Sequence, residues 1–263
     1  MATPRLIGIP YSPWSEKARW ALDARAITWE RETYRPLFGE WRLRRIRKDG
    51  RASVPVLVHE GGVIGDSFEI GKWANAHGSG DSLVPAGRES EVDAWNALAE
   101  RGLAAGRVRS LHRVLSDREG LMELVPRSLR FLGPLARMTA AWGVRRTLRK
   151  YGSQAVSDDT ARATLLDVIE QIRRAIGTGA TTDGHDGAVR YLLGAFSLAD
   201  IAASQVLAFV RPPSTGLKLG VATRRVFGDV EIAATCADVI AWRDALYARH
   251  RERSPMPANR DAP

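Results

Sequence analysis

The stretch of sequence that decides the fold is VPVLVHEGGVIGDS, residues 54–67. Residues 54–58 are rich in β-branched side chains and predict a short strand. Gly61-Gly62 predicts a tight hairpin turn into a second short strand at Val63-Ile64. Asp66-Ser67 then precedes a helical pattern that continues to about His77. The stretch is therefore expected to form two antiparallel strands followed by a helix.

The residues before this stretch predict a second α/β unit. Residues 6–9 indicate a short buried strand, and the Pro-Tyr-Ser-Pro sequence at 10–13 indicates a turn. A helix is expected from Ser15 to about Arg25, followed by a strand from Ile27 to about Tyr34. A polar, basic connection, Gly39–Arg51, leads to the stretch quoted above. The first eighty residues thus read as strand–helix–strand, then strand–strand–helix.

The rest of the chain reads as helical. Apolar side chains at helical spacing predict a long helix to about Leu115, another that ends at Gly177, and a last one over Ala233–Arg249. We therefore expect an α/β domain over residues 1–79 and an all-helical domain over 88–250. The polar, proline-containing residues 251–263 are expected to be disordered.

Composition excludes several classes of protein. The 263 residues contain one cysteine, Cys236, which excludes an internal disulfide framework and a cysteine-rich zinc site. The five histidines show no metal-ligand spacing, so no metal is expected. The N-terminus shows no signal peptide, and the longest apolar stretch, Leu192–Val210, contains polar residues. A cytoplasmic protein is the expectation.

The charge is strongly positive and unevenly distributed. Of 39 basic residues only five are lysines, and the net charge is +9. Arg127–Lys150 holds six arginines and one lysine but no acidic residue. Such a stretch is either a solvated helical face or a surface for a membrane or an acidic partner. Nucleic-acid binding is not expected, because no recognition motif accompanies the charge.

Three short motifs could carry chemistry, and each also has a purely structural interpretation. Ser12 and Ser15 stand at the start of a helix, where a hydroxyl either caps the helix or helps to hold an anion. Val54-Pro55 stands at the entry to a strand, and its peptide bond is either trans or cis. Asp66-Ser67 opens the next helix and is either an ordinary cap or a site that captures a carboxylate.

Together these motifs resemble a known family. SPWSEKARWAL (12–22), VPVLVHEGGVIGDSFEIGKW (54–73) and YLLGAFSLADIAASQVLA (191–208) are similar to segments of the cytosolic glutathione transferases, in particular serine-type or omega-like bacterial members. The resemblance implies a thioredoxin-like N-terminal domain that holds glutathione and an all-helical C-terminal domain that supplies the co-substrate pocket. It also implies a homodimer and a role in detoxification.

The resemblance also implies a role for each motif. Ser12 would be the catalytic residue, because its hydroxyl would donate a hydrogen bond to the glutathione sulfur and favour the thiolate. The Val54 backbone, before a cis Pro55, would pair with the cysteinyl unit, and Asp66 and Ser67 would bind the γ-glutamyl end. Glutathione would be the co-substrate, with no metal. The thiolate would attack a small, hydrophobic electrophile.

Some assignments stay open at this point. Tyr11 or Ser15 could take the place of Ser12 as the catalytic residue. The resemblance also implies a basic residue that binds the glycyl carboxylate of glutathione, and this residue should come from Trp41–Lys48. Ser197 and Asp200 match the family's helix-capping box and are expected to be structural. The alternative function is a non-catalytic glutathione-transferase-like binding protein that uses Arg127–Lys150 to contact a membrane or an acidic partner.

Overall fold

Strand β1 (Arg5–Gly8) lies at the centre of a four-stranded mixed sheet of order β2-β1-β3-β4. It runs parallel to β2 (Glu30–Thr33) and antiparallel to β3 (Val56–His59). The predicted hairpin is confirmed, since β3 pairs antiparallel with β4 (Gly62–Ile64). The structure is a computed structural model, which describes all residues except 1, 35–38, 153–154, 179–188 and 252–263.

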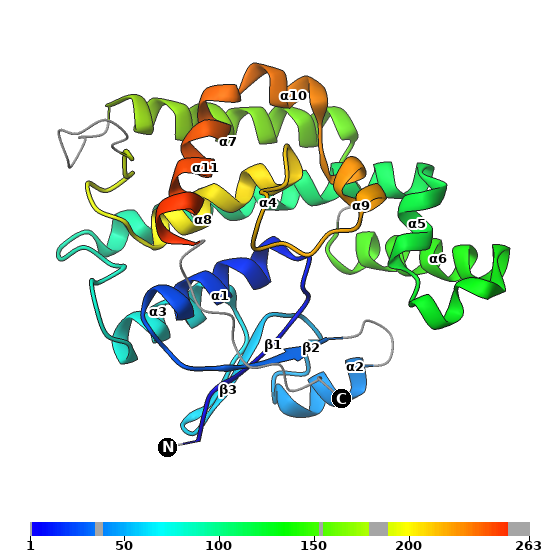
Figure 1. Cartoon of the computed structure of the whole chain (residues 1–263), viewed down its shortest axis with the longest axis horizontal. Coiled ribbons are helices and arrows are strands. Elements are labelled where there is room, and N and C mark those ends of the chain that lie inside the picture. Colours follow the sequence, from blue (N-terminus) through cyan, green and yellow to red (C-terminus); the bar gives the residue numbers. More distant parts are fainter. Residues whose placement is uncertain (1, 35–38, 153–154, 179–188, 252–263) are drawn as a thin grey trace.

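Helices cover both faces of this sheet. In Figure 1, α1 (Pro13–Ala24) and α3 (Ser67–His77) lie on the face toward the helical domain, and α2 (Glu40–Ile46) lies on the other. Because successive side chains of a strand point to opposite faces, Leu6 packs with residues of α1 and α3 while Ile7 packs against α2. The thioredoxin-like N-terminal domain is therefore confirmed.

Helix α2 is a difference from the sequence-based expectation. The segment Gly39–Arg51 was expected to be a plain connection, yet its first half forms this short helix. Leu43 is the helix's one buried residue, so the sequence carries no apolar repeat from which a helix could be predicted. The helix is held by packing of Leu43 against the sheet.

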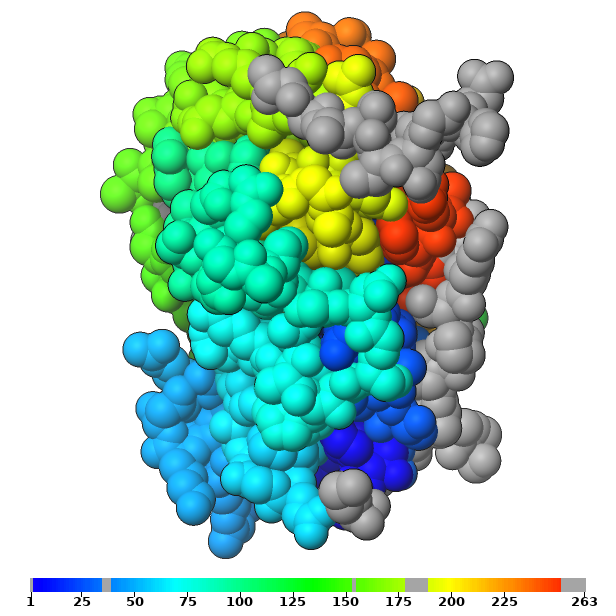
Figure 2. Space-filling model, turned by 90° about the vertical axis from the view of Figure 1, so that its left-hand side faces the viewer, coloured from blue at the N-terminus to red at the C-terminus, as the bar shows by residue number. Residues whose placement is uncertain are grey.

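The C-terminal domain is helical, as expected. Helix α4 (Glu89–Ser116) packs against both α7 (Asp158–Thr178) and α8 (Leu198–Val206). Leu165 and Ile172 are buried on the predicted apolar face of α7. Figure 2 shows the two domains stacked, the blue and cyan N-terminal domain below and the green to orange helices above. Within the described parts of the chain, no helix is both long and apolar enough to cross a membrane.

The last helix is divided, which corrects the expectation of one helix over Ala233–Arg249. The structure has α10 (Val230–Thr235) and α11 (Ala237–His250) instead. Cys236 separates them with a φ of −133°, outside the helical region, and its side chain is buried in the core. The short elements η3 (Leu207–Phe209) and α9 (Val221–Phe227) precede this pair.

Three elements between α4 and α7 leave the main bundle. They are α5 (Arg118–Leu124), η1 (Arg127–Leu132) and α6 (Pro134–Lys150), and Figure 1 shows α5 and α6 projecting beside the α4–α7–α8 bundle. Helix α6 reaches back to the N-terminal domain, where Arg146 forms an ion pair with Glu40. The basic stretch of the sequence is thus η1 and α6, and its end bridges the two domains.

The C-terminal end of the described chain is anchored. Arg251 donates from Nε to Glu16 and from Nη1 to Asp23, at 2.6 Å in both cases. Arg251 therefore belongs to the folded domain, although it was expected to begin a disordered tail. The rest of that expected tail, residues 252–263, lies outside the described residues.

Candidate functional site

The sheet topology brings the three sequence motifs to one edge. β1 leads into the loop that contains Ser12, and β4 leads into Asp66-Ser67. Both strands run antiparallel to β3, whose first residue follows Val54-Pro55. The carboxyl ends of β1 and β4 and the amino end of β3 therefore lie at the same edge of the sheet. Residues far apart in the sequence are gathered there at the beginnings of α1 and α3.

Ser12 is the N-cap of α1. It has an extended backbone, its Oγ accepts a 3.4 Å hydrogen bond from the Ser15 N–H, and Pro13 occupies the first turn of the helix. Its side chain is half-buried. Pro13 has no N–H, and the N–H groups of Ser15 and Glu16 donate to Ser12, so the Trp14 N–H is the one of the first turn that makes no hydrogen bond to another described residue. Because the positive end of the helix dipole is also there, an anion is stabilised at this position.

The other two candidates for that role lie in different surroundings. Ser15 is fully buried, and its Oγ accepts a 3.1 Å hydrogen bond from the Ile9 N–H. A Cβ at Gly8 would lie 3.0 Å from this oxygen, so the Ser15 hydroxyl is enclosed by the protein itself. Tyr11 packs against the helical core, and burial raises the pKa of its phenol. Of the three hydroxyls, only that of Ser12 caps the helix.

The Val54–Pro55 peptide bond is cis, the form that the family resemblance implied. It immediately precedes β3. No hydrogen bond joins the main chain of Val54 to another described residue. Its N–H and C=O therefore remain available for an extended, peptide-like ligand.

Asp66 and Ser67 begin α3 and differ in how they are satisfied. Asp66 is the N-cap, and its Oδ1 accepts hydrogen bonds from the N–H groups of Phe68 (2.8 Å) and Glu69 (3.2 Å). Ser67 is 2% exposed, yet its Oγ has no hydrogen-bond partner among the described residues. A buried hydroxyl without a partner is uncommon, and here it lies at a helix N-terminus suited to a carboxylate.

Arg47 joins two of these motifs, and sequence reasoning did not single it out. Its Nη1 donates to the carbonyl oxygens of Gly65 (2.6 Å) and Ser53 (3.2 Å), and its Nη2 pairs with Asp49 at 2.6 Å. A Cβ at position 65 would stand 2.2 Å from the guanidinium carbon, so a larger residue there would displace the Arg47 side chain. Arg47 therefore fixes the loop of the cis proline against the loop that opens α3.

The remaining basic residues of Trp41–Lys48 divide into two groups. The first group forms ion pairs: Arg42 pairs with Glu32, with one hydrogen bond at 3.1 Å, and Arg47 pairs with Asp49. The exposed side chains of this segment that make no ion pair with any described residue are those of Arg44, Arg45 and Lys48.

Helix α1 is bound to the helical domain directly after Ser12. Trp14 Nε1 donates to one carboxylate oxygen of Glu100 at 2.7 Å, and Lys17 Nζ donates to the other at 2.6 Å. Lys17 also donates to Asn96 at 2.8 Å. These contacts place the middle of α4 against the beginning of α1, so the helical domain supplies a wall beside Ser12.

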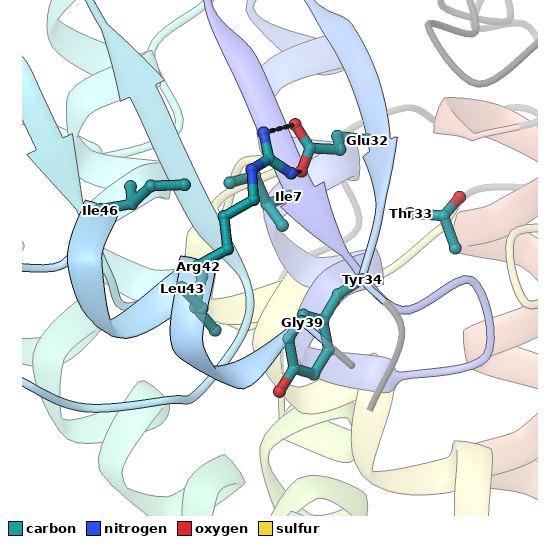
Figure 3. A pocket seen from close by; sticks show the side chains of 8 residues that line it. All are labelled: Ile7, Glu32, Thr33, Tyr34, Gly39, Arg42, Leu43 and Ile46. Carbon is teal, nitrogen blue, oxygen red and sulfur yellow. Dashed lines mark hydrogen bonds and ion pairs between the residues drawn. The ribbon is translucent and has the colours of Figure 1, made fainter. Parts of the chain in front are cut away.

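A cavity of about 210 Å³ lies elsewhere, between β2 and α2. Figure 3 shows Ile7, Leu43 and Ile46 beside it, with the Arg42–Glu32 ion pair across it. None of the three sequence motifs lines it. This cavity is on the α2 face of the sheet and is not the site at the edge.

Ser197 and Asp200 lie inside the helical domain rather than at this edge. Asp200 is fully buried at the start of α8 and accepts hydrogen bonds from the Ser197 N–H, the Ser197 hydroxyl and the Leu192 N–H, at 2.8–2.9 Å. Burial raises the pKa of Asp200 to about 7, although the three donated hydrogen bonds oppose that shift. The pair therefore holds the start of α8, which is the structural role that its sequence indicated.

Comparison with known proteins agrees with this architecture. Residues 11–77 match the family model described as the N-terminal domain of glutathione S-transferase. A comparison with curated proteins finds no match. Within the described chain, no group of three or more His, Cys, Asp or Glu side chains could hold a metal ion.

Solved structures with the same fold cover nearly the whole chain. The beta-etherase LigF from Sphingobium sp. strain SYK-6 is 17% identical with a TM-score of 0.61, and the match covers 94% of this chain and 96% of that chain. A glutathione S-transferase from Methylobacillus flagellatus with glutathione bound is 14% identical (TM-score 0.56; 94% and 96% covered). A glutathione S-transferase from Methylobacterium radiotolerans, in complex with glutathione sulfonate, is 20% identical with a TM-score of 0.57. The match covers 94% of this chain and 91% of that chain.

Proposed function

We propose that this chain, whose residues 11–77 match the N-terminal domain of glutathione S-transferase, is a member of that family, binds glutathione at the sheet edge and activates its thiol for attack on a small electrophile. The observation that carries the proposal is the convergence there of the Ser12 cap, the unpaired Val54 main chain and the unpartnered Ser67 hydroxyl. Two proteins of the same fold were solved with glutathione or its sulfonate bound, which supports the choice of ligand.

Ser12 would act on the sulfur. Its hydroxyl would donate a hydrogen bond to the thiolate, and the N-terminus of α1 would add a favourable field. Lowering the thiol pKa by about two units corresponds to about 2.7 kcal/mol, which these two interactions can supply. The proton of the thiol passes to solvent. The sulfur lone pair then forms a C–S bond with the electrophile, whose leaving group departs with its bonding electrons.

The other two motifs would hold the peptide. The N–H and C=O of Val54 would pair with the cysteinyl unit, as they would with a neighbouring strand. Ser67 would receive the γ-glutamyl carboxylate through its hydroxyl and its own N–H, since the N–H groups of Phe68 and Glu69 already donate to Asp66. Asp66 would attract the ammonium group. Arg47 would not contact glutathione itself. It would hold the loop of the cis proline and the loop before α3 in place through its hydrogen bonds to Ser53 and Gly65.

Replacing Ser67 with alanine should weaken glutathione binding without affecting the fold. The hydroxyl has no hydrogen-bond partner among the described residues to lose, so the variant should be as stable as the original protein. Loss of one hydrogen bond to a charged group should raise the Kd for glutathione about tenfold to a hundredfold. Calorimetric titration measures this, with the exposed Ser128→Ala as the matched control. An unchanged Kd would remove Ser67 from the site.

We also propose, as the resemblance implies, that two copies of the chain form a two-fold dimer in the cytoplasm. Light scattering coupled to size exclusion measures the mass directly. A second candidate function, peripheral binding to an anionic membrane, rests on a separate observation described next.

Large apolar side chains are exposed on η1 and α6. Phe131 is 82% exposed, Met138 66%, Leu135 59% and Trp142 49%. On α6 the positions 135, 138 and 142 share one face, because residues three and four apart are neighbours on a helix. The opposite face of α6, with Ala136, Val144 and Leu148, is buried in the domain. Apolar side chains on an otherwise arginine-rich surface suit insertion among lipid chains.

The charge of the same segment favours one kind of membrane. Arg127–Lys150 contains no acidic residue, so its arginines would attract anionic headgroups while the apolar side chains insert. Co-sedimentation should give binding to vesicles of phosphatidylcholine with phosphatidylglycerol and little binding to phosphatidylcholine alone. Phe131→Ser with Met138→Ser should abolish it, whereas Val221→Ser, exposed on α9, should not. Equal binding by both variants would contradict this second function.

A further inference from the structure

Arg107 on α4 is a half-buried cation that lies beside the first turn of α1. Its guanidinium carbon lies 4.8 Å from the centre of the Trp14 ring and 3.9 Å from that of the Tyr151 ring. Its Nε is buried and has no hydrogen-bond partner among the described residues. The side chain is thus held between two aromatic rings with its donors unused.

No carboxylate of the described residues forms an ion pair with Arg107. The nearest acidic side chain identified is Glu100, whose two oxygens are already bonded to Trp14 and Lys17. Lys150, the other cation against the Tyr151 ring, donates to the carbonyl oxygen of Ala52 and makes no ion pair within the described chain. Two cations therefore lie against one ring with no ion pair to a described residue, and desolvation lowers the pKa of both side chains, although Glu100 opposes the shift of Arg107 and Glu40 that of Lys150. A buried, unpaired charge is costly unless a ligand pairs with it.

The location connects this charge to the proposed reaction. Trp14 is separated from Ser12 by Pro13 alone, so their Cα atoms lie at most about 7 Å apart. A group bound to Arg107 against the Trp14 ring would therefore be held at the first turn of the helix that Ser12 caps. The faces of Trp14 and Tyr151 also offer flat surfaces for such a ring.

We propose that Arg107, assisted by Lys150, binds an anionic group of the co-substrate, and that the natural electrophile is therefore an aromatic compound with a carboxylate. The inference rests on the proposed function and names its substrate class. The guanidinium would bind the carboxylate through paired N–H donors while the ring lies beside Trp14. The glycyl end of glutathione also carries a carboxylate that a guanidinium could bind. The experiment below distinguishes a carboxylate on the co-substrate from the one on glutathione.

Two electrophiles test the charge preference. Chlorodinitrobenzene is neutral, and chlorodinitrobenzoate carries a carboxylate; in both, the thiolate forms a C–S bond and chloride leaves with the C–Cl electrons. Arg107→Met should lower the ratio of kcat/KM for the benzoate to that for the neutral compound by about tenfold to a hundredfold. Arg107→Lys should recover part of the ratio. Arg101→Met removes an exposed arginine from the same helix and should leave the ratio unchanged.

Binding measurements keep this test separate from turnover. Dinitrobenzoate has no leaving group, and calorimetry in the presence of glutathione should show that it binds the original protein and not Arg107→Met. The Kd of glutathione should be the same in both proteins. If Arg107→Met instead weakens glutathione binding, or leaves both the ratio and dinitrobenzoate binding unchanged, the inference is wrong. If dinitrobenzoate binds through Arg107 but neither electrophile is turned over, the proposed function fails and the anion site stands.

Discussion

Replacing Ser12 with alanine should lower kcat for conjugation at least about tenfold while the Kd of glutathione changes less than about twofold. The hydroxyl would stabilise charge on the sulfur, whereas the peptide would be held by Val54 and by the beginning of α3. Steady-state kinetics with chlorodinitrobenzene gives kcat, and calorimetry gives the Kd.

Two neighbouring variants serve as controls for this result. Tyr11→Phe should keep most of the activity. Ser15→Ala should mainly lower stability, because the buried Ser15 hydroxyl accepts a hydrogen bond from the Ile9 N–H and is packed against Gly8, which leaves no room for a ligand beside it. A larger loss of kcat per folded molecule in Ser15→Ala than in Ser12→Ala would show that the catalytic role has been given to the wrong serine.

Replacing Asp200 with alanine should lower the free energy of unfolding by about 3–5 kcal/mol. An exposed helix cap contributes about 1 kcal/mol, but Asp200 is fully buried and accepts three hydrogen bonds. Its removal would leave the Leu192 N–H and the Ser197 N–H and hydroxyl without partners in the core. Urea unfolding measures the loss, and Ser157→Ala, which removes an exposed hydroxyl that accepts the Thr160 N–H, is the smaller control.

The same variant separates structure from chemistry. Asp200 lies at the start of α8 in the helical core, so folded Asp200→Ala protein should keep near-normal activity per molecule. A variant with unchanged stability and abolished activity would place Asp200 in the reaction instead.

Much of the fold could be predicted because its signals are local. The β-branched residues of β3, the glycines of the hairpin and the caps of α1, α3 and α8 are each recognisable within a few residues of sequence. Helix α2 could not be predicted, since it depends on packing of Leu43 against a sheet formed by other segments. The break at Cys236 was equally hidden, because the apolar pattern continues through it.

The site was predictable only in part. The residues expected to hold glutathione stand in recognisable short motifs. Arg47 and Arg107 are two of 34 arginines in the chain, and nothing in their sequence surroundings separates them from the others. Their importance comes from what surrounds them in space: Gly65 and Ser53 around Arg47, and two aromatic rings around Arg107, which makes no ion pair with a described residue.

The central claim is that the protein stabilises the thiolate of bound glutathione through Ser12. The most direct measurement is a pH titration of the thiolate's ultraviolet absorbance with saturating protein. We predict a pKa about two units below that of free glutathione, and a value much closer to the free one in Ser12→Ala. If bound glutathione titrates like the free thiol, or if the original protein and Ser12→Ala give the same lowered pKa, the claim is contradicted.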